Sequence, residues 1–176
     1  MEIKRKRIVI KEKAIELEIW DTSGLERFQE ITFSYFKGMN GFVLVYSIIK
    51  QDTFYDLSRF MNALEERGYR HFPKVLVGTN LEMDEYDPEK DNQELFRMVS
   101  YDEAEEFAER NGMLYFEINV RNGKNVQQPF EGLIERLIEE WESKRKNNVL
   151  KETFQLRNKG NGENRNGQSK CTSCGP

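Results

Sequence analysis

The chain has 176 residues, of which 38% are hydrophobic and 33% are charged, and its formal net charge is −4 at pH 7. This length suits one domain with a tail, and the mild negative charge without a basic stripe argues against nucleic acid binding. No apolar run approaches the roughly 20 residues that span a bilayer, and nothing resembles a signal peptide. We therefore expect a cytoplasmic protein.

The chain begins with two predicted strands, residues 3–10 and 14–20, joined by the charged turn 11–13. In the second strand, isoleucine and leucine at 15, 17 and 19 alternate with glutamate at 16 and 18, which is the period of a strand with one apolar face. We expect an antiparallel hairpin at the edge of a sheet, where the charged side chains hinder pairing with other chains.

Three later apolar runs, residues 41–46, 74–78 and 114–118, are predicted to be parallel strands covered on both faces. Apolar residues at helical spacing predict three helices, which lie between these strands and after the last one. The first helix has apolar residues at Phe54, Leu57, Phe60, Met61 and Leu64. The second has them at Ala104, Phe107 and Ala108; it begins with a capping-box spacing from Ser100 to Glu103 and ends at Gly112. The third has them at Phe130, Leu133, Ile134, Leu137, Ile138 and Trp141. This alternation favours an α/β fold with a parallel sheet.

The predicted domain covers residues 1–146. Residues 84–94 are acidic and polar and are interpreted as a loop insertion. From residue 147 the composition shifts to Asn, Gly, Lys and Arg without a sustained apolar period, so residues 147–176 are predicted to be a flexible basic tail.

The segment Trp20-Asp-Thr-Ser-Gly-Leu-Glu-Arg-Phe28 lies where a strand ends and a loop begins, which is where α/β sheets bind ligands. Asp21 at that point can hold Mg²⁺ through water, and Gly24 lets its backbone N–H approach a phosphate without a β-carbon in the way. The nine residues resemble Trp-Asp-Thr-Ala-Gly-Gln-Glu-Arg-Phe of the Rab and Ras-like small GTPases, with two changes. Segments 34–46 and 97–104 agree in order and spacing, and the resemblance covers roughly residues 2–146.

This resemblance implies a P-loop NTPase-type three-layer α/β sandwich that binds GTP or GDP with Mg²⁺. The implied nucleotide-binding positions are Asp21, Thr22, Gly24, Thr79, Asn80, Glu82, Asn119, Val120 and Arg121, with Asp21 as the Mg²⁺ position. Residues 79–82 stand where the family has Asn-Lys-x-Asp. Glu82 keeps a carboxylate for the base, but Asn80 cannot replace the lysine stem that packs over the ring. Both a weakened base site and an ordinary loop remain open for this segment. Residues 119–121 stand where Ser-Ala-Lys offers a backbone N–H to the base.

Position 25 is the place where the family has the glutamine that orients the attacking water in phosphoryl transfer. Leu25 can neither donate nor accept a hydrogen bond, so we expect slow hydrolysis and no intact catalytic residue. The resemblance also implies that Leu25, Glu26, Arg27 and Phe28 form a surface for protein effectors or regulators.

The phosphate loop Gly-x-x-x-x-Gly-Lys-Ser/Thr does not occur in the 176 residues. In the family the first strand, this loop, the first helix and the first switch precede the hairpin, and the loop supplies most phosphate contacts. We therefore expect an N-terminally truncated fold with impaired GTP binding and hydrolysis. We also expect a gap in the sheet between the strand ending at Trp20 and the strand near Phe42.

Cys171 and Cys174 follow the basic tail, which resembles the doubly prenylated ends of Rab proteins, although their spacing differs from the usual pair. The resemblance implies lipidation and attachment to the cytosolic face of a membrane; two unmodified cysteines are the alternative. A disulfide between them would close a trivial loop, and two ligands are too few for a zinc site.

Three functions remain open at this stage. The first is a truncated pseudo-GTPase of vesicle trafficking or signalling that acts as a membrane-anchored binding module. The second is part of a longer Rab-like GTPase whose first ~45 residues are missing because of a misplaced start, a length set by the loop, helix and switch that precede the hairpin. The third is a redox protein using Cys171 and Cys174, which is disfavoured because this pair does not begin a helix that would stabilise a thiolate.

Overall fold

Three parallel strands form the central sheet of the computed structural model, which describes residues 2–22, 36, 38–80 and 96–160, the last fourteen by their backbone alone. They are β3 (Phe42–Ser47), β4 (Lys74–Thr79) and β5 (Leu114–Glu117), in the order β3-β4-β5. Both pairs are parallel, with Leu44 opposite Leu76 and Leu76 opposite Tyr115. The prediction of a parallel sheet from three apolar runs is therefore confirmed.

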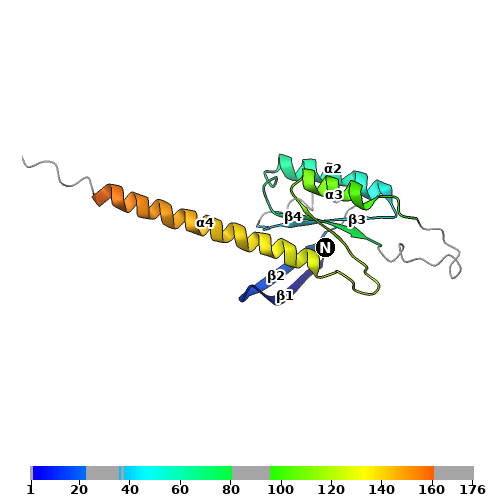
Figure 1. Cartoon of the computed structure of the whole chain (residues 1–176), viewed down its shortest axis with the longest axis horizontal. Helices are drawn as coiled ribbons and strands as arrows, with labels where there is room; N and C mark the ends of the chain where they lie inside the picture. Colours follow the sequence, from blue (N-terminus) through cyan, green and yellow to red (C-terminus); the bar gives the residue numbers. More distant parts are fainter. Residues whose placement is uncertain (1, 23–35, 37, 81–95, 161–176) are drawn as a thin grey trace, which may run out of the picture. The chain divides into compact units, whose positions relative to one another are not determined.

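Helices cover both faces of this sheet. On one face lie α2 (Gln51–Glu66) and α3 (Tyr101–Arg110), which Figure 1 shows together on the same side of β3 and β4. The buried members of their shared core are Leu44, Tyr46, Ile48, Phe54, Leu57, Leu76, Val99, Ala104, Ala108 and Met113. On the other face, Leu133 of α4 (Gln128–Gly160) packs with Val75 and Val77 of β4. The result is three layers, helix on sheet on helix.

Local sequence signals explain the ends of α3. The Ser100 hydroxyl accepts a hydrogen bond from the backbone N–H of Glu103 at 3.2 Å, as the capping-box spacing predicts. At the other end Gly112 adopts a φ of 65°, the left-handed conformation that ends a helix at little cost in glycine. The helix thus begins and ends where the sequence indicated.

The first two strands form the predicted antiparallel hairpin. Strand β1 (Glu2–Ile10) pairs with β2 (Lys13–Asp21) in a continuous register from Glu2 opposite Asp21 to Ile10 opposite Lys13. The turn is shorter than predicted, because Lys13 already belongs to the strand. Its two residues, Lys11 and Glu12, have φ values of 49° and 64°. A two-residue turn with both φ values positive matches the twist of the flanking strands.

The hairpin is a sheet of its own. Among the described strands, β1 and β2 pair only with each other, and β3 pairs only with β4. The described strands thus differ from the expectation of a hairpin at the edge of the parallel sheet, and they agree with the expected gap between the strand ending at Trp20 and the strand near Phe42. The physical reason is that no described strand supplies the backbone donors and acceptors that would join β2 to β3.

The hairpin turn gives a stability prediction. The double substitution Lys11→Asn with Glu12→Gly should raise the free energy of unfolding by about 1 kcal/mol, because asparagine and glycine tolerate positive φ far better than other residues. A urea melt of the chain would measure the change. The matched control is Lys11→Ala with Glu12→Ala, which also removes the 3.6 Å ion pair between Lys11 and Glu135 but keeps both β-carbons. Equal stability of the two variants would contradict the prediction.

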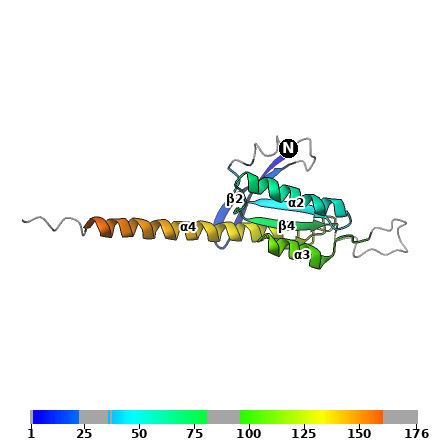
Figure 2. The same ribbon diagram turned by 90° about the horizontal axis from the view of Figure 1, so that it is seen from above.

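Helix α4 continues as backbone helix through Gly160, so residues 147–160 are helical where composition predicted an irregular tail. The helix gains one backbone hydrogen bond per added residue once it is nucleated, which offsets the weak propensity of its asparagines. Residues 161–176 lie outside the described part. Trp141, predicted on the apolar stripe, is 57% exposed, with the Arg145 guanidinium 5.4 Å from its ring centroid. Figure 2 gives a second view of the ribbon.

Candidate functional site

The carboxyl ends of β4 and β5 carry most of the described residues of the predicted site. The backbone N–H of Ile118, just after β5, donates to the carbonyl oxygen of Gly78 in β4 at 2.9 Å. A β-carbon on Gly78 would lie 3.1 Å from both the Ile48 side chain and the Tyr46 hydroxyl, so glycine is what lets these chains approach. The loops after residues 79 and 118 therefore start side by side at one edge of the sheet.

The loop after β4 is held by Thr79 and Asn80. The Thr79 hydroxyl donates to the carbonyl oxygen of Tyr46 at 2.9 Å, and the Ser47 hydroxyl donates to Oδ1 of Asn80 at 2.7 Å. Asn80 has a φ of 69°, a conformation that asparagine adopts more readily than most residues. Its short side chain is thus bound to β3 and lacks the length of a lysine stem. Glu82 lies outside the described residues.

The loop after β5 is organised by Asn119, whose side chain is almost fully buried. Its Oδ1 accepts hydrogen bonds from the backbone N–H groups of Arg121 and Asn122 at 3.0 and 3.1 Å, and its own N–H donates to the carbonyl oxygen of Lys124. This is an asparagine-centred turn of the kind that mimics a backbone turn. Within the described residues the N–H of Val120 has no hydrogen-bond partner, so it is available to an acceptor from outside.

The remaining site residues are only partly described. Asp21 and Thr22, at the end of β2, are both exposed to solvent. Gly24, Leu25, Glu26, Arg27 and Phe28 lie outside the described residues, as do Cys171 and Cys174. The structure therefore brings together the positions after β4 and β5, while the predicted effector surface and the lipidation sites stay predictions.

Comparison with known proteins decides the family. The model of the Ras family matches residues 1–139. The chain belongs to the Ras family.

Among its relatives are Rab proteins. Ras-related protein Rab-18-B of Danio rerio is 37% identical over 147 residues, which cover 81% of this chain and 66% of that protein. Ras-related protein Rab-2B of Dictyostelium discoideum is 33% identical over 143 residues, which also cover 81% of this chain and 66% of that protein. Ras-related protein RABE1e of Arabidopsis thaliana is 30% identical over 176 residues, which cover 98% of this chain and 77% of that protein. This Ras-family chain is thus Rab-like, and it spans 66% of the length of the first two relatives.

Proteins of the Ras family bind GTP or GDP with Mg²⁺, and the described residues of this chain match such a site in part. The unpaired N–H of Val120 is a donor that a base carbonyl oxygen can use, and the exposed Asp21 carboxylate is a hard oxygen ligand of the kind Mg²⁺ prefers. Asn80 does not fit the role of the lysine stem, since its side chain is bonded to Ser47. Within the described residues no group of three or more metal-ligating side chains could hold an ion by itself.

A buried polar network that the sequence analysis missed supports the β5 end of this Rab-like domain. The Arg97 guanidinium binds both carboxylate oxygens of Glu117, at 2.7 and 2.9 Å. The Tyr115 hydroxyl donates to Glu117 at 2.5 Å and lies 2.7 Å from the Tyr46 hydroxyl. The signal for it was a single glutamate at the end of an otherwise apolar strand, because a charge that is largely removed from solvent requires a partner.

Burial raises the pKa of both tyrosines of this network. It is the main cause that raises the pKa of Tyr46 to about 12, and the nearby Glu117 carboxylate adds to the rise. Burial also raises the pKa of Tyr115, followed by its hydrogen bond to Glu117. The carboxylate of Glu117 is held by an arginine and a tyrosine directly before the loop at Asn119.

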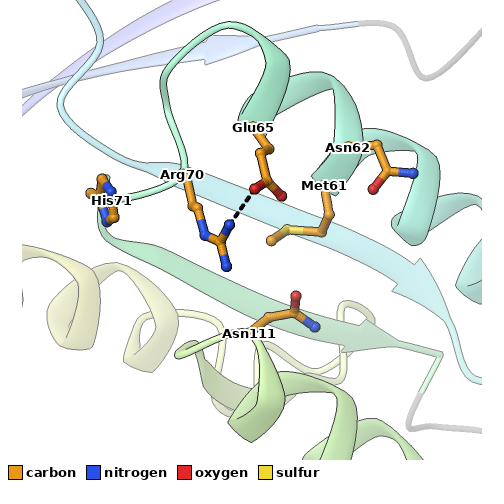
Figure 3. Close-up of a pocket in the computed structure, with 6 residues that line it drawn as sticks. All are labelled: Met61, Asn62, Glu65, Arg70, His71 and Asn111. Atoms are coloured by element: carbon orange, nitrogen blue, oxygen red, sulfur yellow. Dashed lines mark hydrogen bonds and ion pairs between the residues drawn. The ribbon is translucent and has the colours of Figure 1, made fainter.

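A cavity of about 290 Å³ lies at another part of the domain, lined by Met61, Asn62, Glu65, Arg70, His71 and Asn111. Figure 3 shows the Arg70 guanidinium turned toward the Glu65 carboxylate, with which it forms an ion pair. The Asn111 side-chain amide donates to the carbonyl oxygen of Phe107 at 2.8 Å. None of the predicted nucleotide-binding residues lines this cavity.

The described part of the chain contains no helix that is both long and apolar enough to cross a bilayer.

Proposed function

We propose that this chain is a Rab-like small GTP-binding protein of vesicle trafficking or signalling whose nucleotide binding and hydrolysis are impaired. The family match over residues 1–139 supports the first half. The observation that carries the second half, impaired binding, is Asn80. This residue stands where the family has a lysine over the base, and its side chain is hydrogen-bonded to Ser47. Its function is then protein binding through residues 25–28, with nucleotide turnover reduced or absent.

The absence of a phosphate loop from the 176 residues adds to this proposal. Consecutive backbone N–H groups, a lysine and a hydroxyl on Mg²⁺ supply most of the affinity of such sites for phosphates. The donor at Val120 and the carboxylate at Asp21 contribute single interactions, each worth about 1–3 kcal/mol. Such a sum is far below what submicromolar binding requires, about 8 kcal/mol.

The test is a titration of the 176-residue chain with a fluorescent guanine nucleotide in the presence of Mg²⁺. We expect no saturable binding at submicromolar concentration. Val120→Pro, which removes the unpaired N–H, should weaken any residual binding further, whereas Val126→Ala outside the site should not. Saturable submicromolar binding by the unaltered chain would overturn the proposal.

A second candidate function is favoured by the comparisons. The 176 residues span 66% to 77% of the length of the Rab relatives, which fits part of a longer Rab-like GTPase that binds GTP and hydrolyses it slowly because of Leu25. Mapping the 5′ end of the transcript separates the two candidates. An upstream in-frame Gly-x-x-x-x-Gly-Lys-Ser/Thr would establish the second, and a start at Met1 would favour the first.

The proposal includes attachment to the cytosolic face of a membrane through geranylgeranylated Cys171 and Cys174. Each buried CH₂ of a lipid contributes ~0.8 kcal/mol and each basic residue near an anionic surface ~1 kcal/mol. Two lipid chains with Arg157, Lys159, Arg165 and Lys170 nearby should therefore anchor the protein stably.

Intact-mass analysis of the protein from its native host should show two added lipid groups. The variant with Cys171→Ser and Cys174→Ser should move from the membrane fraction to the soluble fraction. An unmodified mass, or the same fractionation for both forms, would show that the cysteines do not anchor the chain.

A further inference from the structure

Three large apolar side chains stand exposed together just before and at the start of α3. Phe96 is 68% exposed, Met98 is 54% exposed and Tyr101 is 47% exposed. All three lie within six consecutive residues of the chain, and Tyr101 is the first residue of α3. These three residues, with the exposed carboxylates of α3, are called here the acidic-aromatic surface.

The residues between the exposed side chains are bound to the rest of the domain. Arg97 and Val99, which alternate with the exposed pair, point inward: Arg97 binds Glu117, and Val99 is fully buried. The backbone N–H groups of Met98 and Val99 both donate to the carbonyl oxygen of Ile48, at 2.8 and 3.1 Å. These contacts fix Arg97, Val99 and the backbone at Met98, while the side chains of Phe96 and Met98 remain exposed.

The charge next to these side chains is strongly negative. Helix α3 carries one arginine and five acidic residues, all exposed: Asp102, Glu103, Glu105, Glu106 and Glu109. The arginine, Arg110, already lies 3.8 Å from Glu106. Arg97 does not offset this charge at the surface, because its guanidinium is bound to Glu117.

We propose that the acidic-aromatic surface is a docking site for a basic, apolar segment of a partner protein. Phenylalanine and tyrosine give rigid contact area, methionine adapts its shape to the partner, and aromatic faces also attract lysine and arginine. The surrounding carboxylates select a positively charged partner and repel anionic membrane lipids. The proposal does not depend on nucleotide binding, because the surface uses no residue of the predicted nucleotide site.

The test uses the full chain and a short fluorescent peptide of alternating lysine and leucine. Its fluorescence anisotropy should show binding that weakens with salt. The variant with Phe96→Ser and Met98→Ser should bind about tenfold or more weakly, which corresponds to the loss of one well-packed apolar anchor. Tyr55→Ser, an equally exposed aromatic residue on α2, is the matched control and should bind as the unaltered chain does.

Two further measurements separate the apolar contribution to binding from the electrostatic contribution. A peptide with serine in place of leucine should bind about tenfold more weakly, and Glu105→Gln with Glu106→Gln should reduce the salt dependence. Equal loss of binding in Tyr55→Ser, or equal affinity for the lysine–serine peptide, would overturn the proposal in favour of diffuse charge attraction. Binding to neutral lipid vesicles that the Phe96 and Met98 substitutions abolish would overturn it in favour of a membrane surface.

Discussion

Arg97→Met should lower the free energy of unfolding by about 2–3 kcal/mol, which is a large share of the total stability of a small domain. The Glu117 side chain is only 9% exposed, and the substitution leaves its carboxylate with the Tyr115 hydroxyl as its remaining side-chain partner. Arg97 itself is 23% exposed, so the expected loss lies below that of a fully buried pair. Denaturant melts followed by circular dichroism would measure it.

Two further variants test whether the loss comes from the unpaired Glu117 carboxylate. Arg59→Met removes an exposed arginine that lies 4.0 Å from Asp56, and its effect should stay within about 0.5 kcal/mol because surface ion pairs contribute little. The double variant Arg97→Met with Glu117→Met should recover much of the loss, since no unpaired charge then remains buried. A double variant that is less stable than Arg97→Met alone would show that the network stabilises by more than charge pairing.

Placing the first strand, phosphate loop and first helix of a Rab relative before Met1 should restore guanine nucleotide binding, by roughly a thousandfold or more. The phosphate loop supplies the backbone donors, lysine and hydroxyl that the 176 residues lack, and the added strand supplies the pairing that β2 and β3 do not make with each other. Fluorescent-nucleotide titration of the grafted and unaltered chains measures the gain. Unchanged affinity would mean that the loops after β4 and β5 no longer form a base site.

In the same grafted protein, Leu25→Gln should raise the rate of phosphate release by about a hundredfold, because a glutamine there can orient the attacking water. Leu25→Met is the matched control, since methionine has a similar volume and makes no comparable hydrogen bond. Phosphate release in single-turnover experiments separates this step from nucleotide binding. Equal rates for the glutamine and methionine variants would show that water positioning does not depend on residue 25.

The positions of the secondary-structure elements were predictable because their signals are local. The alternation at residues 15–19, the apolar run at 74–78 and the cap at Ser100 each depend on neighbours within a few residues. The family was also predictable, since nine consecutive residues from Trp20 to Phe28 are specific enough to identify it, and the match over residues 1–139 confirms it.

The amino-acid sequence by itself determined the family, the parallel strands and most of the elements, but not the continuation of α4 through Gly160. Only the tertiary structure decided that the hairpin is a separate sheet, that Asn80 is bonded to Ser47, and that Arg97 neutralises Glu117. The Ser47–Asn80 and Arg97–Glu117 contacts join residues 33 and 20 positions apart, and the sequence pattern at one partner does not specify the other. The inward positions of Arg97 and Val99 depend on distant residues in the same way, because Arg97 binds Glu117 of β5 and the N–H of Val99 donates to Ile48, just after β3.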